Sequence, residues 1–132
     1  MSEENVEIVR RAVEAFEREG LDGSLRHYDP EIEWSTTDVS IERATYRGHD
    51  GVRRFFGSFD DEFNDLRFDV EDLIDAGETV ILTLRVGGRG KASGAAVELT
   101  RFYVCSLRDG MIYRVRTYPE RAGALEAAGL RE

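Results

Sequence analysis

The sequence has few of the residues that most often carry covalent or metal chemistry. It contains one cysteine and two histidines in 132 residues. Cys105 has no partner for an internal disulfide and lies in the apolar run FYVCSL, so we expect a buried, inert thiol. His27 and His49 lie in different segments and show no metal-ligand spacing with each other or with Cys105. The sequence therefore predicts no metal site and no cofactor.

Positive charge is scarce as well. Eighteen Lys and Arg stand against 27 Asp and Glu, which gives a formal net charge of −9. This field repels phosphate backbones and anionic membrane surfaces, so neither nucleic acid nor a membrane is an expected partner. No apolar run approaches the roughly 20 residues that cross a bilayer, and the N-terminal MSEENVEIVRR has acids where a secretion signal would be basic and then apolar. We expect a cytoplasmic protein.

The first half of the chain is patterned for helices. Residues 1–132 are enough for one domain with a single core, since 41% of them are hydrophobic. Apolar residues recur at helical spacing over residues 3–19, and a short second helix is expected over residues 22–28, followed by a strand near 31–35. Residues 38–48 show no period and predict a loop. From His49 a third helix carries an aromatic stripe that we interpret as core.

The second half alternates with the period of two that is typical of strands. Residues 66–71 and 80–86 predict a hairpin, and the glycine-rich segment 87–94 predicts an exposed turn or a bulged hairpin tip. A strand over residues 96–107 then turns at Arg108-Asp109-Gly110 into residues 111–118, and a last short helix follows Pro119 and closes at Gly129. Helices first and strands later indicate an α+β fold with helices on one face of a bent antiparallel sheet.

Four segments in this order, YRGHDGVRRFF, GRGKASG, SLRDGMI and YPERAGALEAAGL, resemble the SnoaL-like, ketosteroid isomerase-like branch of the nuclear transport factor 2-like superfamily. The resemblance implies a cone-shaped α+β roll, in which a curved antiparallel sheet wraps round the long N-terminal helix. It also implies an open-ended apolar pocket inside the cone and a homodimer formed through the sheet. The superfamily includes isomerases, cyclases, epoxide hydrolases and non-catalytic binders, so the fold alone selects no reaction.

The resemblance, combined with strand alternation, predicts which side chains line this pocket. The predicted lining residues are Trp34, Thr36, Thr83, Arg85, Arg101, Tyr103, Tyr113, Val115 and Thr117. Such a pocket suits a small hydrophobic or anionic organic ligand, because Arg85 and Arg101 can hold a carboxylate or phosphate through paired hydrogen bonds. The alternative is that each arginine pairs with an acid such as Glu98, or that a register one residue different turns it outward.

Steroid isomerisation by the family's mechanism is not expected. At the positions that resemble the isomerase's tyrosine, base and donor aspartate, this chain has Ala12, Thr36 and Tyr103. The acids of the strands alternate opposite the apolar positions, and none is clearly aimed inward.

Three hypotheses about function remain open. The chain is a small-molecule binder without an evident base, or it is an enzyme of the cyclase, isomerase or epoxide hydrolase type that acts on a small carbonyl or epoxide. In the enzyme, Tyr103 with Arg85 or Arg101 would stabilise an oxyanion, and Asp38 would supply the base. The third hypothesis is an interaction module whose functional surface is the sheet face that carries Arg114, Arg116 and Tyr118.

Overall fold

The computed structural model describes residues 2–36 and 45–130 and contains four α-helices and six strands in these ranges. The helical segments are α1 (Ser2–Glu19), α2 (Leu21–Ser24), the 3-10 turn η1 (Leu25–His27), α3 (Gly48–Glu62) and α4 (Arg121–Ala127). The strands are β1 (Tyr28–Thr36), β2 (Thr45–Arg47), β3 (Phe63–Asp75), β4 (Thr79–Gly90), β5 (Ala96–Arg108) and β6 (Met111–Tyr118). This order confirms the α+β class. No helix of the described chain is both long enough and apolar enough to span a membrane.

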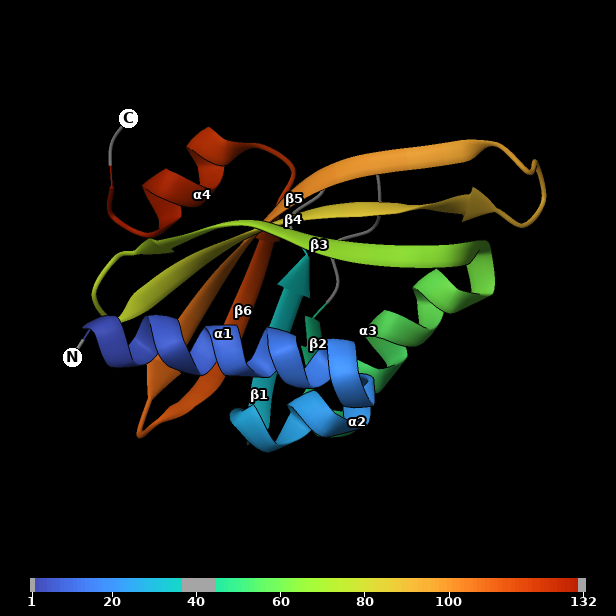
Figure 1. The fold of residues 1–132 in the computed structure, drawn as a ribbon. Coiled ribbons are helices and arrows are strands. Elements are labelled where there is room, and N and C mark those ends of the chain that lie inside the picture. The colour runs from blue at the N-terminus through green and yellow to red at the C-terminus, as the bar shows by residue number, and fades with distance from the viewer. Residues whose placement is uncertain (1, 37–44, 131–132) are drawn as a thin grey trace.

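The strands form one curved, open sheet in the order β2-β1-β6-β5-β4-β3 (Figure 1). Strands β3 to β6 are the predicted antiparallel meander. The sheet, predicted as antiparallel, is mixed, because β1 pairs with β6 in parallel. A short turn forces antiparallel pairing only on strands that it joins directly, whereas β1 and β6 are connected through most of the chain.

The segment predicted as a loop also contains regular structure. Thr45–Arg47 pairs with β1 as strand β2, and α3 begins at Gly48. A strand of three residues is too short to show a period of two, which is why the sequence pattern did not reveal it. The candidate base Asp38 lies outside the described residues.

The glycine-rich segment is only partly a turn. Strand β4 continues to Gly90, and Gly87 pairs with Arg67 on one side and Glu98 on the other. A Cβ at Gly87 would come within 2.6 Å of the Arg67 guanidinium. Gly87 therefore lies within the sheet, under the Arg67 side chain, and not in a turn.

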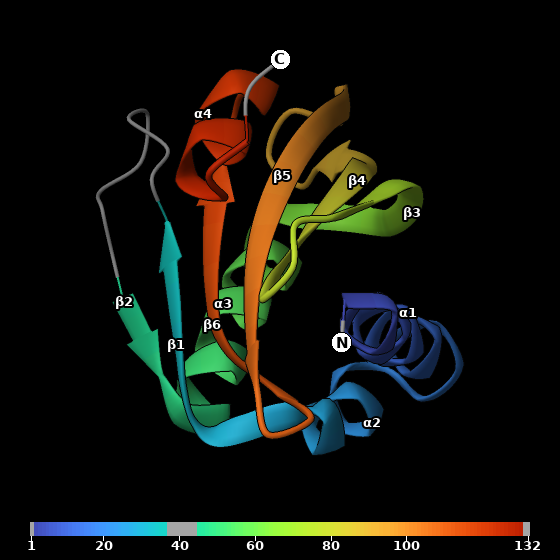
Figure 2. The same cartoon turned by 90° about the vertical axis from the view of Figure 1, so that its left-hand side faces the viewer.

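Helices cover both faces of the central strands. Helices α1 and α3 lie on the concave side of the sheet, and α4 lies beside the C-terminal end of β6 (Figure 2). The main core fills the concave side, and a second cluster around Ile81, Val104, Ala124 and Leu125 joins α4 to the opposite, outer face. Because both faces are covered here, β4 is buried continuously from Val80 to Leu84.

Candidate functional site

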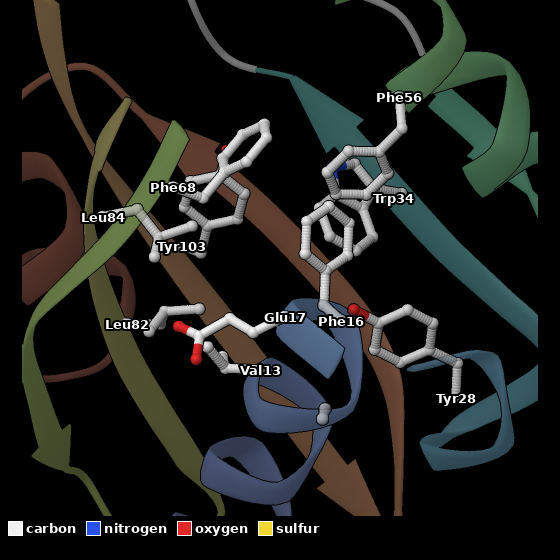
Figure 3. A pocket seen from close by; sticks show the side chains of 11 residues that line it. Val13, Phe16, Glu17, Tyr28, Trp34, Phe56, Phe68, Leu82, Leu84 and Tyr103 are labelled. Atoms are coloured by element: carbon white, nitrogen blue, oxygen red, sulfur yellow. The ribbon is translucent and has the colours of Figure 1, made fainter. Parts of the chain in front are cut away.

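A cavity of about 50 Å³ lies between α1, α3 and the concave face of the sheet. We call it the aromatic cavity. Its lining residues are Ala12, Val13, Phe16, Glu17, Tyr28, Trp34, Phe56, Phe68, Leu82, Leu84 and Tyr103. Figure 3 shows these side chains converging from α1, β1, α3, β3, β4 and β5. Residues far apart in the sequence therefore build one site.

Local patterns explain how the walls are made. Helix α1 presents Val13, Phe16 and Glu17 at helical spacing, so they share one face toward the sheet. The rings of Phe16 and Phe56 join α1 to α3 at a centroid distance of 5.5 Å. Phe56 in turn lies 5.4 Å from the Trp34 ring of β1. This aromatic packing fixes the cavity on the side away from β4.

Trp34 is the most informative residue of this wall. Its side chain is 3% exposed, and its indole Nε1 has no hydrogen-bond partner among the described residues. In Figure 3 the indole nitrogen is turned to the side where Tyr103 lies, and the two rings are in edge contact at 5.9 Å. A buried donor without a partner costs about 1–3 kcal/mol, and a bound acceptor can remove that penalty.

Two tyrosines add hydroxyl groups that stay protonated. Burial raises the pKa of Tyr28 well above its ordinary value, and the nearby Cys105 adds to the effect. Burial also raises the pKa of Tyr103, against a smaller lowering by the Arg101 cation. Both phenols are therefore neutral hydrogen-bonding groups at physiological pH and do not act as phenolate bases.

A second cavity of about 150 Å³ lies on the other side of Tyr103. We call it the arginine cavity. Its lining residues are Thr36, Phe55, Phe59, Glu62, Phe63, Val86, Leu99, Arg101, Tyr103 and Thr117. Arg101 is half-buried and donates to the Thr100 carbonyl at 3.0 Å, and the Thr117 hydroxyl donates to the Ser35 carbonyl at 3.5 Å. Tyr103 is a wall of both cavities.

The structure brings five of the predicted lining residues together around these cavities. Trp34 and Tyr103 line the aromatic cavity, and Thr36, Arg101, Tyr103 and Thr117 line the arginine cavity. Ala12, which resembles the position of the isomerase tyrosine, also lines the aromatic cavity. Val115 is 1% exposed and packs within the main core.

The inward orientation predicted for Thr83 and Arg85 is wrong. Leu82 and Leu84 line the aromatic cavity from β4, so the residues between and after them point to the outer face. There the Arg85 Nε lies 2.8 Å from Glu71 and 3.3 Å from Glu98. This is the predicted alternative of a paired arginine, and it arises because burial on both faces of β4 hides the alternation that sets the register.

Tyr113 was predicted to line the pocket, but it lines neither cavity. The guanidinium of Arg108 lies over its ring, 4.3 Å from the centroid, beside the β5–β6 turn. The register of β5 and β6 shifts between Ser106 and Leu107. Because of this irregularity, the alternation that puts Val115 and Thr117 inward does not extend to Tyr113.

Two acids line the cavities although no inward acid was predicted. Glu17 lines the aromatic cavity and Glu62 lines the arginine cavity; both residues are exposed. Figure 3 shows the Glu17 carboxylate on the side of the cavity where Leu82 lies. A signal for Glu17 was present in the sequence, because it follows Val13 by four residues on the apolar face of α1. The aromatic stripe of α3, interpreted as core, also forms walls of both cavities through Phe55, Phe56 and Phe59.

The histidines and the cysteine lie apart from the chemistry of both cavities. The His49 ring bonds to the Tyr28 carbonyl oxygen at 2.9 Å and so links the start of α3 to β1. Burial raises the pKa of Cys105 to about 12, so this thiol is not a nucleophile at neutral pH. Among residues 2–36 and 45–130, His, Cys, Asp and Glu form no cluster of three with the arrangement of a metal site.

Solved structures with the same architecture place this site in a known fold. An NTF2-like protein from Burkholderia thailandensis is 26% identical, with a TM-score of 0.78 and coverage of 94% of each chain. TerC, co-crystallised with polyporic acid, is 19% identical, with a TM-score of 0.76 and coverage of 96% of this chain and 98% of TerC. A protein of ketosteroid isomerase-like fold from Catenulispora acidiphila, in complex with trimethylamine, is 16% identical, with a TM-score of 0.72 and coverage of 94% and 93%.

The sequence itself supports the same relationship. No curated protein matches this chain. The sequence profile of the SnoaL-like domain matches residues 9–115, which include the second part of α1, all of α3 and most of the sheet. The chain belongs to the SnoaL-like domain family.

Proposed function

We propose that the protein binds a small, largely apolar organic molecule that carries one hydrogen-bond acceptor. The observation that supports this most directly is the indole Nε1 of Trp34, which is buried on the wall of an otherwise mostly apolar cavity and has no partner in the described chain. An apolar ligand would displace water from the aromatic walls, and its acceptor would satisfy the indole N–H. Both the apolar walls and the indole N–H therefore favour binding of such a ligand.

The arginine cavity extends the same proposal. Its walls combine aromatic rings with the Arg101 guanidinium and the hydroxyls of Tyr103 and Thr117. Because Tyr103 belongs to both cavities, a ligand that moves this ring can reach from one to the other. The neighbours crystallised with polyporic acid and with trimethylamine support the general form of the proposal, since both have this fold and were obtained with a small organic molecule.

The fluorescence of Trp34 tests the proposal, because it is the only tryptophan of the chain. We expect small apolar alcohols and ketones to change its emission saturably and to raise the melting temperature. Trp34→Phe keeps an aromatic wall and removes the N–H, so the ligand-induced rise in melting temperature should shrink. If no such compound changes the emission or the melting temperature of the wild-type protein, the proposal is wrong.

A catalytic function is the second candidate, and Glu17 is the observation that favours it. A carboxylate on the lining of the cavity that Trp34 also lines supplies the base that the strands lack. In such an enzyme, the carbonyl oxygen of a ketone would accept from the indole N–H while Glu17 removed a proton from the adjacent carbon. Exchange of that proton with deuterated solvent, followed by NMR, should be accelerated by the wild-type protein and lost in Glu17→Gln. Binding without exchange would leave the chain a binder.

A further inference from the structure

The walls of the aromatic cavity are unusual in the charges that they combine. Six of its eleven lining residues are aromatic, one is a carboxylate, and none is Lys, Arg or His. The face of an aromatic ring carries the negative end of its quadrupole, so such walls attract a cation as well as an apolar group. The cavity is therefore complementary to an organic cation that has an apolar surface.

We propose that the aromatic cavity selects the trimethylammonium end of a choline-like amino alcohol over an uncharged group of the same shape. This inference rests on the proposed function, since it specifies the ligand of that cavity. The hydroxyl oxygen of the same molecule is the acceptor that the Trp34 indole N–H lacks.

The spacing of the aromatic rings suits a methylated ammonium group. When the methyl groups touch the rings, the nitrogen lies about 5 Å from their centroids, within the range of a cation–π interaction. The rings are close enough together to act jointly, because Phe16 lies 5.5 Å from Phe56 and 5.4 Å from Phe68.

The charge distribution favours the cation at both short and long range. Glu17 provides a carboxylate at the cavity, and the net charge of −9 attracts cations toward the molecule. Arg101 lines the arginine cavity and not the aromatic cavity. Tyr103 lines both cavities. A trimethylammonium group has no N–H, so it can lie against aromatic walls without losing a hydrogen bond.

A matched pair of ligands tests the inference. Choline and 3,3-dimethylbutan-1-ol have the same shape and the same hydroxyl, and only choline is charged. Titrations followed by calorimetry and by Trp34 fluorescence should show choline binding about tenfold more tightly, the factor that a cation–π contribution of this kind gives. In Glu17→Gln the affinity for choline should fall about threefold, as expected for a partly exposed charge pair, and the preference for choline over the alcohol should fall with it.

Glu14→Gln is the matched control for the charge change. Glu14 is exposed on the same helix and does not line the cavity, so this variant should retain the preference for choline. Equal affinity for the two ligands, or tighter binding of the alcohol, would overturn the inference and leave the proposed function standing. If neither ligand, nor any other small apolar alcohol or ketone, perturbed Trp34, the inference and the proposed function would fail together.

Discussion

Thr83→Val is expected to stabilise the protein. The Thr83 side chain is 5% exposed, and its hydroxyl Oγ1 is buried without a hydrogen-bond partner among the described residues. In the unfolded chain water satisfies this hydroxyl, so folding leaves a desolvated polar group that costs about 1–3 kcal/mol. Valine has nearly the same shape and the same preference for strands, and therefore removes the penalty without leaving a cavity.

The free energy of unfolding should therefore rise by about 1–2 kcal/mol. For a chain of this length, each kcal/mol corresponds to a rise of about 3–5 °C in melting temperature. Urea unfolding should show a higher midpoint with an unchanged slope. Protein concentrations should be equal in all samples, because self-association would also shift the midpoint.

Thr117→Val is the matched control, since Thr117 is also buried in a strand and its hydroxyl donates to the Ser35 carbonyl. Removing that donor should lower stability by about 1 kcal/mol. The pair also tests the orientation of β4, because Thr83 points outward and Thr117 lines the arginine cavity. A midpoint for Thr83→Val at or below that of the wild type would show that the hydroxyl has a partner. A loss of ligand binding in Thr83→Val would show that β4 faces the other way.

Three further predictions follow from single contacts. A Cβ at Gly51 would lie 2.8 Å from the Tyr46 carbonyl carbon, so Gly51→Ala should lower the free energy of unfolding by about 1–3 kcal/mol. On the same helix, a Cβ at Gly57 would meet no atom within 4 Å, so Gly57→Ala should raise the free energy of unfolding slightly. Urea unfolding of the two variants tests both expectations. Burial, aided by the Arg26 and Arg11 cations, lowers the pKa of His27, so the unfolded chain takes up its proton first as pH falls below about 6.5. The free energy of unfolding, measured by urea unfolding, should therefore decrease as the pH is lowered through this value. If a His27→Asn variant lost stability with pH to the same extent, His27 would not be the cause. Cys105, with a pKa raised to about 12 by burial, should resist iodoacetamide until denaturant is added, and rapid labelling of the folded protein, followed by mass spectrometry, would refute its burial.

Patterns over long segments predicted most of the architecture. Helix α1 and the meander from β3 to β6 each repeat one period over many residues, so a single irregular position does not obscure them. The Asp109-Gly110 turn has positive φ at both residues, 53° and 77°, which is the conformation that this dipeptide favours in a two-residue hairpin. Local chemistry was sufficient at these positions because neighbours in the sequence are also the interacting partners.

The parallel pairing of β1 with β6 shows where such patterns end. Trp34 lies opposite Val115 in this pair, yet about eighty residues of chain separate them. The direction of β1 depends on the path through β2 and α3, and no local period records that path. The same applies to the orientation of β4. Its inward and outward residues are both mostly apolar, because α1 covers one face of this strand and α4 covers the other.

By itself, the sequence determined the α+β class, the helical and strand segments and the resemblance to the SnoaL-like fold, because these follow from periodicity and from motif order along the chain. It also predicted Trp34, Arg101 and Tyr103 as lining residues, and the structure has them on the walls of the two cavities. Only the tertiary structure decided that Arg85 pairs on the outer face with Glu71 and Glu98, and that Glu17 lines the aromatic cavity. These outcomes depend on strand register and on how a helix is rotated against the sheet, which are set by packing between distant segments and not by the local pattern.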